Sequence, residues 1–320
     1  MFRRLTALGL GLVLLAGCGT EGLRETPADP GATSPATVEI TPADAQAAFE
    51  GLGDLSDAWK NRDCAEIQQL TTGVEGTIGS GVCAAARDGY AAPVFRAYRD
   101  PEFLLPRRED GEAGAWFAVL ARKPQPAYFV FVWADGRWRL GAGPIPLVGK
   151  APVQDDAVFD AEAVPDAAVA ARLAPTRHVA FLTDPSGVNG AGVSGVRFAS
   201  GDPMRRLLAE LVGAPGRARP DRLTTDVRLE GPARALALPG GGALVFHALR
   251  VVFTQKPGSG RSSLAHPRYR AADVRAFTGG AATTVTGGEI VVLATKVAKD
   301  TTMTTVGMRR VLADIGKGSG

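Results

Sequence analysis

Histidine, cysteine and the motifs of common enzymes are scarce in this sequence. Only three histidines and three cysteines occur among 320 residues. The histidines, His178, His247 and His266, are too far apart to show the ligand spacing of a metal site. The absence of a G-x-S-x-G elbow, an H-E-x-x-H pair and a P-loop excludes the best-known hydrolase, metalloprotease and nucleotide-hydrolysing signatures. We therefore expect no metal and no cofactor, and we favour a protein that is not an enzyme.

Two segments match catalytic or cofactor patterns only loosely. Residues 190–195 carry the glycine spacing of a dinucleotide-binding turn, but a strand-like run follows them where the motif requires a helix. We interpret this segment as a loop. Residues 258–266 hold serines close to His266 without a visible base and acid to activate them. A hydrolase therefore stays a less favoured alternative.

Long apolar runs and a strong charge bias are also missing from most of the chain. After residue 18 no apolar run reaches the roughly 20 residues that a membrane span needs. The formal net charge is +3, and Arg3 and Arg4 at the N-terminus account for most of it. A nearly neutral protein has little electrostatic attraction for nucleic acid, so we expect no nucleic-acid partner. The hydrophobic content of 45% is still sufficient for a well-packed core.

The N-terminus has the pattern of an export signal. Arg3 and Arg4 precede an apolar run over residues 5–15, which has the length of a signal-peptide core. A leucine and two small residues then lead directly to Cys18. This pattern resembles the bacterial lipoprotein signal. The resemblance implies removal of residues 1–17, a diacylglycerol thioether on Cys18, and a protein anchored to the extracytoplasmic face of the cell membrane.

The segment after the lipidated cysteine predicts a tether. Residues 18–40 are rich in proline, alanine and threonine and show no hydrophobic period. They contain too little apolar surface to form a core, and their prolines favour an extended backbone. We expect this stretch to hold the folded part away from the lipid surface.

Cys64 and Cys83 remain as a pair once Cys18 is assigned to the lipid. Disulfides persist outside the cytoplasm, and a bridge here would close a loop of about 20 residues and stabilise the fold by roughly 3 kcal/mol. Asp63 before Cys64 looks like a helix cap. The alternative is a reactive thiol, because a helix N-terminus favours the thiolate. We favour the bridge, since no C-x-x-C motif supports redox chemistry.

Residues 41–150 predict a first α+β lobe. Thr41 and Pro42 form a helix start, and apolar residues at helical spacing continue from it to Trp59. The clearest hairpin joins residues 128–133 to residues 137–140 through Asp135-Gly136, a sequence typical of tight strand connections. We expect the tryptophans to be mainly core residues, with the lining of a binding cleft as the alternative.

Residues 151–315 predict a second lobe, separated from the first by a proline- and glycine-rich break near residue 150. A possible helix over residues 156–174, with residues 177–182 as a strand or a helix end, precedes a helix that begins at Asp202-Pro203 and stops before Gly213. The expected strands are residues 224–229, 233–238, 244–253, 274–277, 289–294 and, less clearly, 308–315, with glycine pairs and triplets between them.

Each lobe has helical sequence followed by antiparallel strands. This order and the hairpin over residues 133–138 resemble the NTF2-like fold, a cystatin-like cone in which helices pack on a curved antiparallel sheet. The whole chain also resembles actinobacterial cell-surface lipoproteins built from two such lobes. The residues that carry this resemblance are the signal ending at Cys18, residues 103–107, Trp116-Phe117 and the phenylalanine-rich strand before Trp138. The resemblance implies no particular activity.

Two further features are candidates for binding. His247 shares one face of its predicted strand with apolar residues, so it is either a hydrogen-bonded core histidine or a group inside a cavity. A set of arginines near the end of the predicted 202–213 helix could contact anionic polymers of the envelope or lipid headgroups, or could simply form a solvated face. These arginines are Arg205, Arg206, Arg217, Arg219 and Arg222.

Three classes of function remain open from the sequence. The first is a non-catalytic surface protein that presents an interaction or binding face to an envelope protein or polymer. The second is a carrier or sensor of a small apolar ligand in an NTF2-like cavity. The third, least favoured, is an NTF2-like enzyme. We rank the non-catalytic interaction protein first, because every familiar catalytic signature is absent.

Overall fold

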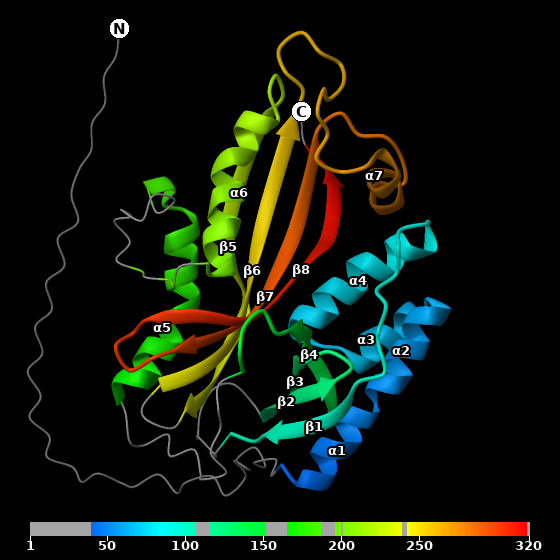
Figure 1. Ribbon diagram of the computed structural model, residues 1–320. Helices are drawn as coiled ribbons and strands as arrows, with labels where there is room; N and C mark the ends of the chain where they lie inside the picture. The colour runs from blue at the N-terminus through cyan, green and yellow to red at the C-terminus, as the bar shows by residue number, and fades with distance from the viewer. Residues whose placement is uncertain are drawn as a thin grey trace, which may run out of the picture. The chain divides into compact units, whose positions relative to one another are not determined.

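The computed structural model describes residues 40–106, 115–151, 165–186, 196, 198–199, 201–238 and 242–318. Residues Val38–Gly320 form one compact α+β unit. It contains two four-stranded antiparallel sheets, ordered β1-β2-β3-β4 and β5-β6-β7-β8 (Figure 1). The α+β class is therefore confirmed. The signal peptide, Cys18, most of the tether and the glycine-rich loop at residues 190–195 lie outside the described residues.

Within the described residues, four helices precede the first sheet. They are α1 (Pro42–Glu50), α2 (Leu52–Asn61), α3 (Cys64–Leu70) and α4 (Gly73–Arg87). The Thr41 side chain caps α1 by accepting a hydrogen bond from the backbone of Asp44, as the sequence predicts. The single helix expected through Trp59 is divided at Gly51, which separates α1 from α2. Glycine weakens a helix interior, which accounts for the break.

The predicted disulfide between Cys64 and Cys83 is confirmed. It joins the start of α3 to the interior of α4 with the two Cα atoms 5.6 Å apart. Asp63 caps α3 by accepting from the backbone N–H groups of Ala65 and Glu66. Cys83 lies in the interior of α4 and not at a helix N-terminus.

The first sheet consists of β1 (Arg99–Leu104), β2 (Trp116–Lys123), β3 (Ala127–Ala134) and β4 (Arg137–Pro146). The predicted hairpin is confirmed as β3 and β4. Its two turn residues, Asp135 and Gly136, have positive φ angles of 50° and 76°, as tight hairpin turns require. Trp133 and Trp138 face each other across this hairpin, with ring centroids 5.3 Å apart.

The central strands β2 and β3 are buried on both faces, which explains their nearly continuous apolar sequence. On one face, Phe129 packs against Phe49 of α1 with ring centroids 5.9 Å apart. On the other face, Trp116 and Tyr128 contact Phe246 of the second sheet. Trp59 and Trp116 are buried, so the core interpretation of these two tryptophans is confirmed.

The second half begins with α5 (Pro165–Leu182) and α6 (Pro203–Arg217). Residues 177–182 are thus the end of a helix rather than a strand. Asp202 caps α6 by accepting from the backbone N–H of Met204, as predicted. The helix does not stop before Gly213 but continues through Pro215 to Arg217. Leu211 and Ala214 remain buried, so packing sustains the helix beyond the glycine.

The second sheet is built from β5 (Arg222–Leu238), β6 (Gly242–Lys256), β7 (Val285–Val297) and β8 (Met303–Lys317). The two strands expected over residues 224–229 and 233–238 form one strand with an irregular register between Glu230 and Arg234. The predicted strand at residues 308–315 is confirmed. Residues 274–277, expected as a strand, instead belong to the helix α7 (Ala271–Thr278).

The second sheet shares cores with both of its neighbours. One face, including Phe246 and Val292, joins the core that contains the first sheet and the helices α1–α4. The opposite face, including Val245 and Leu293, packs with residues of α5 and α6 in a second core. The expected lobe boundary near residue 150 falls between the end of β4 and the start of α5; division into two domains stays a prediction. No helix among the described residues is long and apolar enough to cross a membrane.

Candidate functional site

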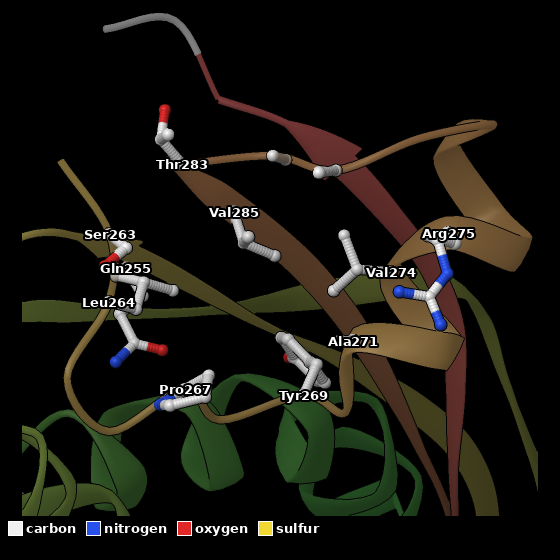
Figure 2. Close-up of a pocket in the computed structure, with 12 residues that line it drawn as sticks. Gln255, Ser263, Leu264, Pro267, Tyr269, Ala271, Val274, Arg275, Thr283 and Val285 are labelled. Atoms are coloured by element: carbon white, nitrogen blue, oxygen red, sulfur yellow. The ribbon is translucent and has the colours of Figure 1, made fainter.

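A pocket of about 310 Å³ lies at one end of the second sheet. The loop between β6 and α7, the helix α7, the segment that leads into β7, and the adjoining ends of β6 and β7 enclose it (Figure 2). Its lining is mainly apolar. The lining residues are Gln255, Ser263, Leu264, Pro267, Tyr269, Ala271, Val274, Arg275, Ala281, Ala282, Thr283 and Val285.

The base of this pocket is a small hydrophobic cluster. Val274 from α7, Val285 from β7 and Ile315 from β8 form its buried part. Leu264 and Tyr269 are only partly buried against that cluster, so they leave apolar surface facing the pocket. Figure 2 shows Val274 and Val285 near the middle of the lining residues.

Tyr269 forms one wall of the pocket, and its ring packs directly against Gly287 of β7. A Cβ atom added to Gly287 would lie 2.4 Å from the ring of Tyr269, so only glycine allows this close approach. The sequence suggests that Gly287 and Gly288 separate strands, whereas both lie within β7. Their role is to admit side chains from other segments onto the sheet.

The loop that closes the pocket is held by a buried hydrogen-bond network. The carboxylate of Asp221 accepts from the backbone N–H groups of Ala265 and His266 at 2.8 and 2.9 Å. The Gln255 side chain donates to the carbonyl of His266 at 2.7 Å and accepts from the backbone N–H of Arg268 at 2.9 Å. These bonds fix the loop in place, so the pocket has a preformed wall.

Apart from Gln255 and the hydroxyl of Tyr269, the polar side chains that line the pocket lie at its edge. Ser263 and Thr283 lie on one side, and Arg275 lies on the other (Figure 2). All three residues are exposed. Arg275 pairs with no carboxylate in the part of the chain that the structure describes. The site therefore combines an apolar interior with a cation and two hydroxyl groups at its rim.

Beside the pocket, two arginines and two glutamates form a charge network. Arg268 and Arg310 each pair with both Glu210 and Glu289. The guanidinium carbon of Arg268 also lies 3.4 Å from the ring centroid of Phe253. Hydrogen bonding from Arg310, opposed by burial, lowers the pKa of Glu210 to about 2. The two positive and two negative charges compensate each other. Because they come from α6, the loop, β7 and β8, the network holds α6 and the loop on the sheet.

His247, the histidine singled out from the sequence, lies outside this pocket. It is buried on the face of β6 that packs with α5 and α6, which agrees with the predicted apolar face. Its ring lies against that of His178 on α5, with centroids 4.7 Å apart. The sequence does not reveal this pairing, because it depends on how α5 packs on the sheet.

The two histidines differ in their hydrogen bonding. Nδ1 of His178 lies 2.8 Å from the carbonyl oxygen of Ala174, but its Nε2 has no partner among the described residues. Neither ring nitrogen of His247 has one. Burial, opposed by the bond to Ala174, lowers the pKa of His178 to about 4. The pKa of His247 is lowered mainly by burial and also by the neighbouring His178. The backbone of Val245 partly opposes this shift, although it forms no hydrogen bond with the ring.

The five predicted anion-contacting arginines do not form one uniform surface. Arg205 donates to the carbonyl of Phe198, and Arg217 donates to the carbonyl of Glu210. Arg206, Arg219 and Arg222 are exposed. Their contact with anions stays a prediction.

Comparison with known proteins adds no functional assignment. No family model, no curated protein and no solved structure matches this chain. The function must therefore be inferred from the chemistry of the pocket itself.

Proposed function

We propose that this protein is a lipid-anchored, non-catalytic binding protein on the extracytoplasmic face of the cell membrane. We further propose that its pocket holds a small amphiphile with an apolar body and an anionic end. The observation that carries this proposal is the mainly apolar lining of the 310 Å³ pocket. Sites for small molecules range from about 300 to 1,000 Å³ and are mostly apolar with a few placed polar groups.

The lining suggests how such a ligand would be oriented. Val274, Val285 and Leu264 offer apolar surface to the body of the ligand. Arg275 at the rim offers a guanidinium, whose donors match the geometry of a carboxylate or phosphate. An anionic end would then remain near solvent while the apolar part leaves water, which is the main source of binding energy.

The anchor rests on the N-terminal sequence. Arg3 and Arg4, the apolar run and the small residues before Cys18 together support export and lipidation. Labelled palmitate supplied to cells making the protein should appear on the wild type and be absent from Cys18→Ala. Equal labelling of both proteins would rule out Cys18 as the lipid site.

We also propose that each sheet with its preceding helices is an NTF2-like unit. The order of elements supports this view, since α1–α4 precede the first sheet and α5 and α6 precede the second. The helix α7, inserted between β6 and β7, departs from a simple meander and contributes directly to the pocket.

A matched pair of variants tests ligand binding. Ala271 lines the pocket, while its neighbour Ala272 does not line it, and both are exposed at the start of α7. Decanoate should displace the fluorescent probe N-phenyl-1-naphthylamine from the wild type and from Ala272→Trp. Ala271→Trp should bind the probe at least about tenfold more weakly, a loss of 1.4 kcal/mol. Equal binding by both variants would place the ligand elsewhere.

A second candidate function is presentation of an apolar face to an envelope protein. Val169 and Leu173, one helical turn apart on α5, are 56% and 44% exposed. Val169→Ser/Leu173→Ser should reduce crosslinking to envelope proteins in intact cells while leaving probe displacement unchanged. Unchanged crosslinking would remove this second candidate.

A further inference from the structure

The interior between α5 and β6 contains a concentration of unpartnered polar atoms. His178, His247 and Thr295 are 0%, 5% and 0% exposed. Four of their atoms lack a hydrogen-bond partner among the described residues: Nε2 of His178, both ring nitrogens of His247, and Oγ1 of Thr295. Buried polar groups are nearly always bonded, so several orphans in one place require a specific explanation.

The register of the sheet brings His247 and Thr295 together, and α5 adds His178. His247 on β6 pairs with Leu293 on β7, and Val245 pairs with Thr295. His247 and Thr295 are therefore diagonal neighbours on the same face, a separation that side chains can bridge. His178 approaches the same face from α5, where its ring lies 4.7 Å from that of His247.

The bonding of His178 determines which nitrogen is available. Its Nδ1 can bond the carbonyl of Ala174 only by donating its hydrogen, at 2.8 Å. The neutral ring then carries its lone pair on Nε2, the atom that has no partner. A backbone carbonyl that fixes the tautomer in this way is the usual support of a metal-binding histidine.

We propose that His178 and His247 bind a soft monovalent metal ion, Cu(I), between their imidazole nitrogens. Imidazole suits copper. Rings whose centroids lie 4.7 Å apart would hold the ion in a bent arrangement, and the Thr295 hydroxyl, unpartnered among the described residues, would complete three-coordination. Structural zinc, by contrast, takes four protein ligands, and the described residues contain no group of three or more histidine, cysteine or acidic side chains suited to a metal.

The surroundings of the pair also favour a single positive charge. The cluster that encloses it is apolar, with the Phe198 ring 5.0 Å from that of His178. The cost of burying an ion increases steeply with its charge, so an enclosure built from the apolar residues of this cluster favours a monovalent ion. An apolar enclosure also keeps water away from the reduced metal.

The test uses the purified mature protein, lipidated on Cys18 and with its disulfide intact, so that no free thiol competes for the metal. The two probes are Cu(I), kept reduced by ascorbate, and Ag(I), which does not change oxidation state. We expect about one ion per chain, held against competition by bicinchoninate for Cu(I), with X-ray absorption showing nitrogen donors at low coordination number. His178→Phe/His247→Phe should lose at least about tenfold in affinity. The control, His266→Gln, changes the exposed third histidine and should bind as the wild type does.

Two results would overturn the proposal. One is equal metal affinity in the wild type and the double phenylalanine variant, with both folded by circular dichroism. The other is a wild type that takes up neither ion, with NMR showing both histidine rings unchanged on addition of Ag(I). Should the double variant not fold, the ring signals of the wild type alone decide the question.

Discussion

Two buried sites in this protein differ in whether their ionisable groups have partners. Glu75 on α4 is 5% exposed, yet it accepts from Arg309 of β8 and, at 3.0 Å, from the backbone N–H of Gly143. His178 and His247 are buried to a similar extent, with three ring nitrogens unpartnered among the described residues. The paired group connects α4, β4 and β8 and so stabilises the fold. The unpaired groups stabilise little as they stand and are available to a ligand.

Breaking the paired site should have the largest effect. Arg309→Leu would leave the Glu75 carboxylate buried without its counter-ion, which typically costs about 3–5 kcal/mol. Arg309 also donates to the carbonyl of Gly143 at 2.9 Å, so that acceptor would lose its partner too. Urea denaturation followed by circular dichroism would measure the loss of unfolding free energy.

A double variant separates charge from packing. Glu75→Leu/Arg309→Leu removes both charges and should recover much of the lost stability, because no buried charge remains uncompensated. Arg206→Leu, a change at an exposed arginine, should stay within about 0.5 kcal/mol of the wild type. A double variant no more stable than Arg309→Leu would show that packing, and not charge, dominates at this site.

The disulfide is the second device that stabilises the N-terminal half. Cys64→Ser/Cys83→Ser should lower the free energy of unfolding by about 3 kcal/mol in the chain-entropy model. Unfolding of the wild type in a reductant should reproduce this loss, whereas the reductant should leave the serine variant unchanged. Equal stability of the oxidised and reduced wild type would contradict the prediction.

The histidine pair should make stability depend on pH. The pKa of His178 is lowered to about 4 in the folded protein, whereas the pKa of an unfolded histidine is about 6.5. The unfolded chain therefore binds more protons between these values, and stability falls as the pH falls through this window. His178 alone should cost about 1.6 kcal/mol between pH 6.5 and pH 5, because the slope rises toward about 1.4 kcal/mol per pH unit only below pH 6.5.

Variants identify the source of this pH dependence. His178→Phe/His247→Phe should flatten the stability profile between pH 5 and pH 6.5, because neither residue can then be protonated on unfolding. His266→Gln should keep the wild-type slope, since His266 is exposed. A double variant with an unchanged slope would assign the pH dependence to carboxylates instead.

Local chemistry was predictable from the sequence where a few adjacent residues decide it. Thr41 and Asp202 cap their helices, and Asp135-Gly136 turns the β3–β4 hairpin, because each effect acts within about one turn of chain. The strand expected at residues 274–277 was wrong because a short apolar run fits either a strand or a helix. The sequence signal that favours the helix is Gly279 just after this run. In the structure it ends α7 in the left-handed conformation, with φ 68°.

The two candidate sites were not predictable in the same way. The His178–His247 contact depends on how α5 packs on β6, and the pocket depends on a loop that Asp221 and Gln255 hold from other elements. The apolar alternation around His247 predicted its burial correctly, but alternation says nothing about what packs from the other side. Such convergence of distant segments is a property of the tertiary fold.

The smallest change in stability, and the sharpest functional contrast, is expected at Arg275. This arginine lies exposed at the pocket rim and forms no ion pair within the described ranges, so Arg275→Gln should leave the free energy of unfolding within about 0.5 kcal/mol of wild type. The affinity of the Arg275→Gln variant for decanoate should fall by about tenfold. A hydrogen bond to a charged group contributes about 1.5–3 kcal/mol, and solvent at the exposed rim reduces that contribution here. Decanol, which has the same chain without the charge, should bind both proteins equally in the naphthylamine displacement assay. An equal loss of affinity for decanol would mean that Arg275 acts by shaping the pocket and not by its charge. The distinction between paired charges that stabilise the fold and unpaired charges that bind ligands would then fail at this site.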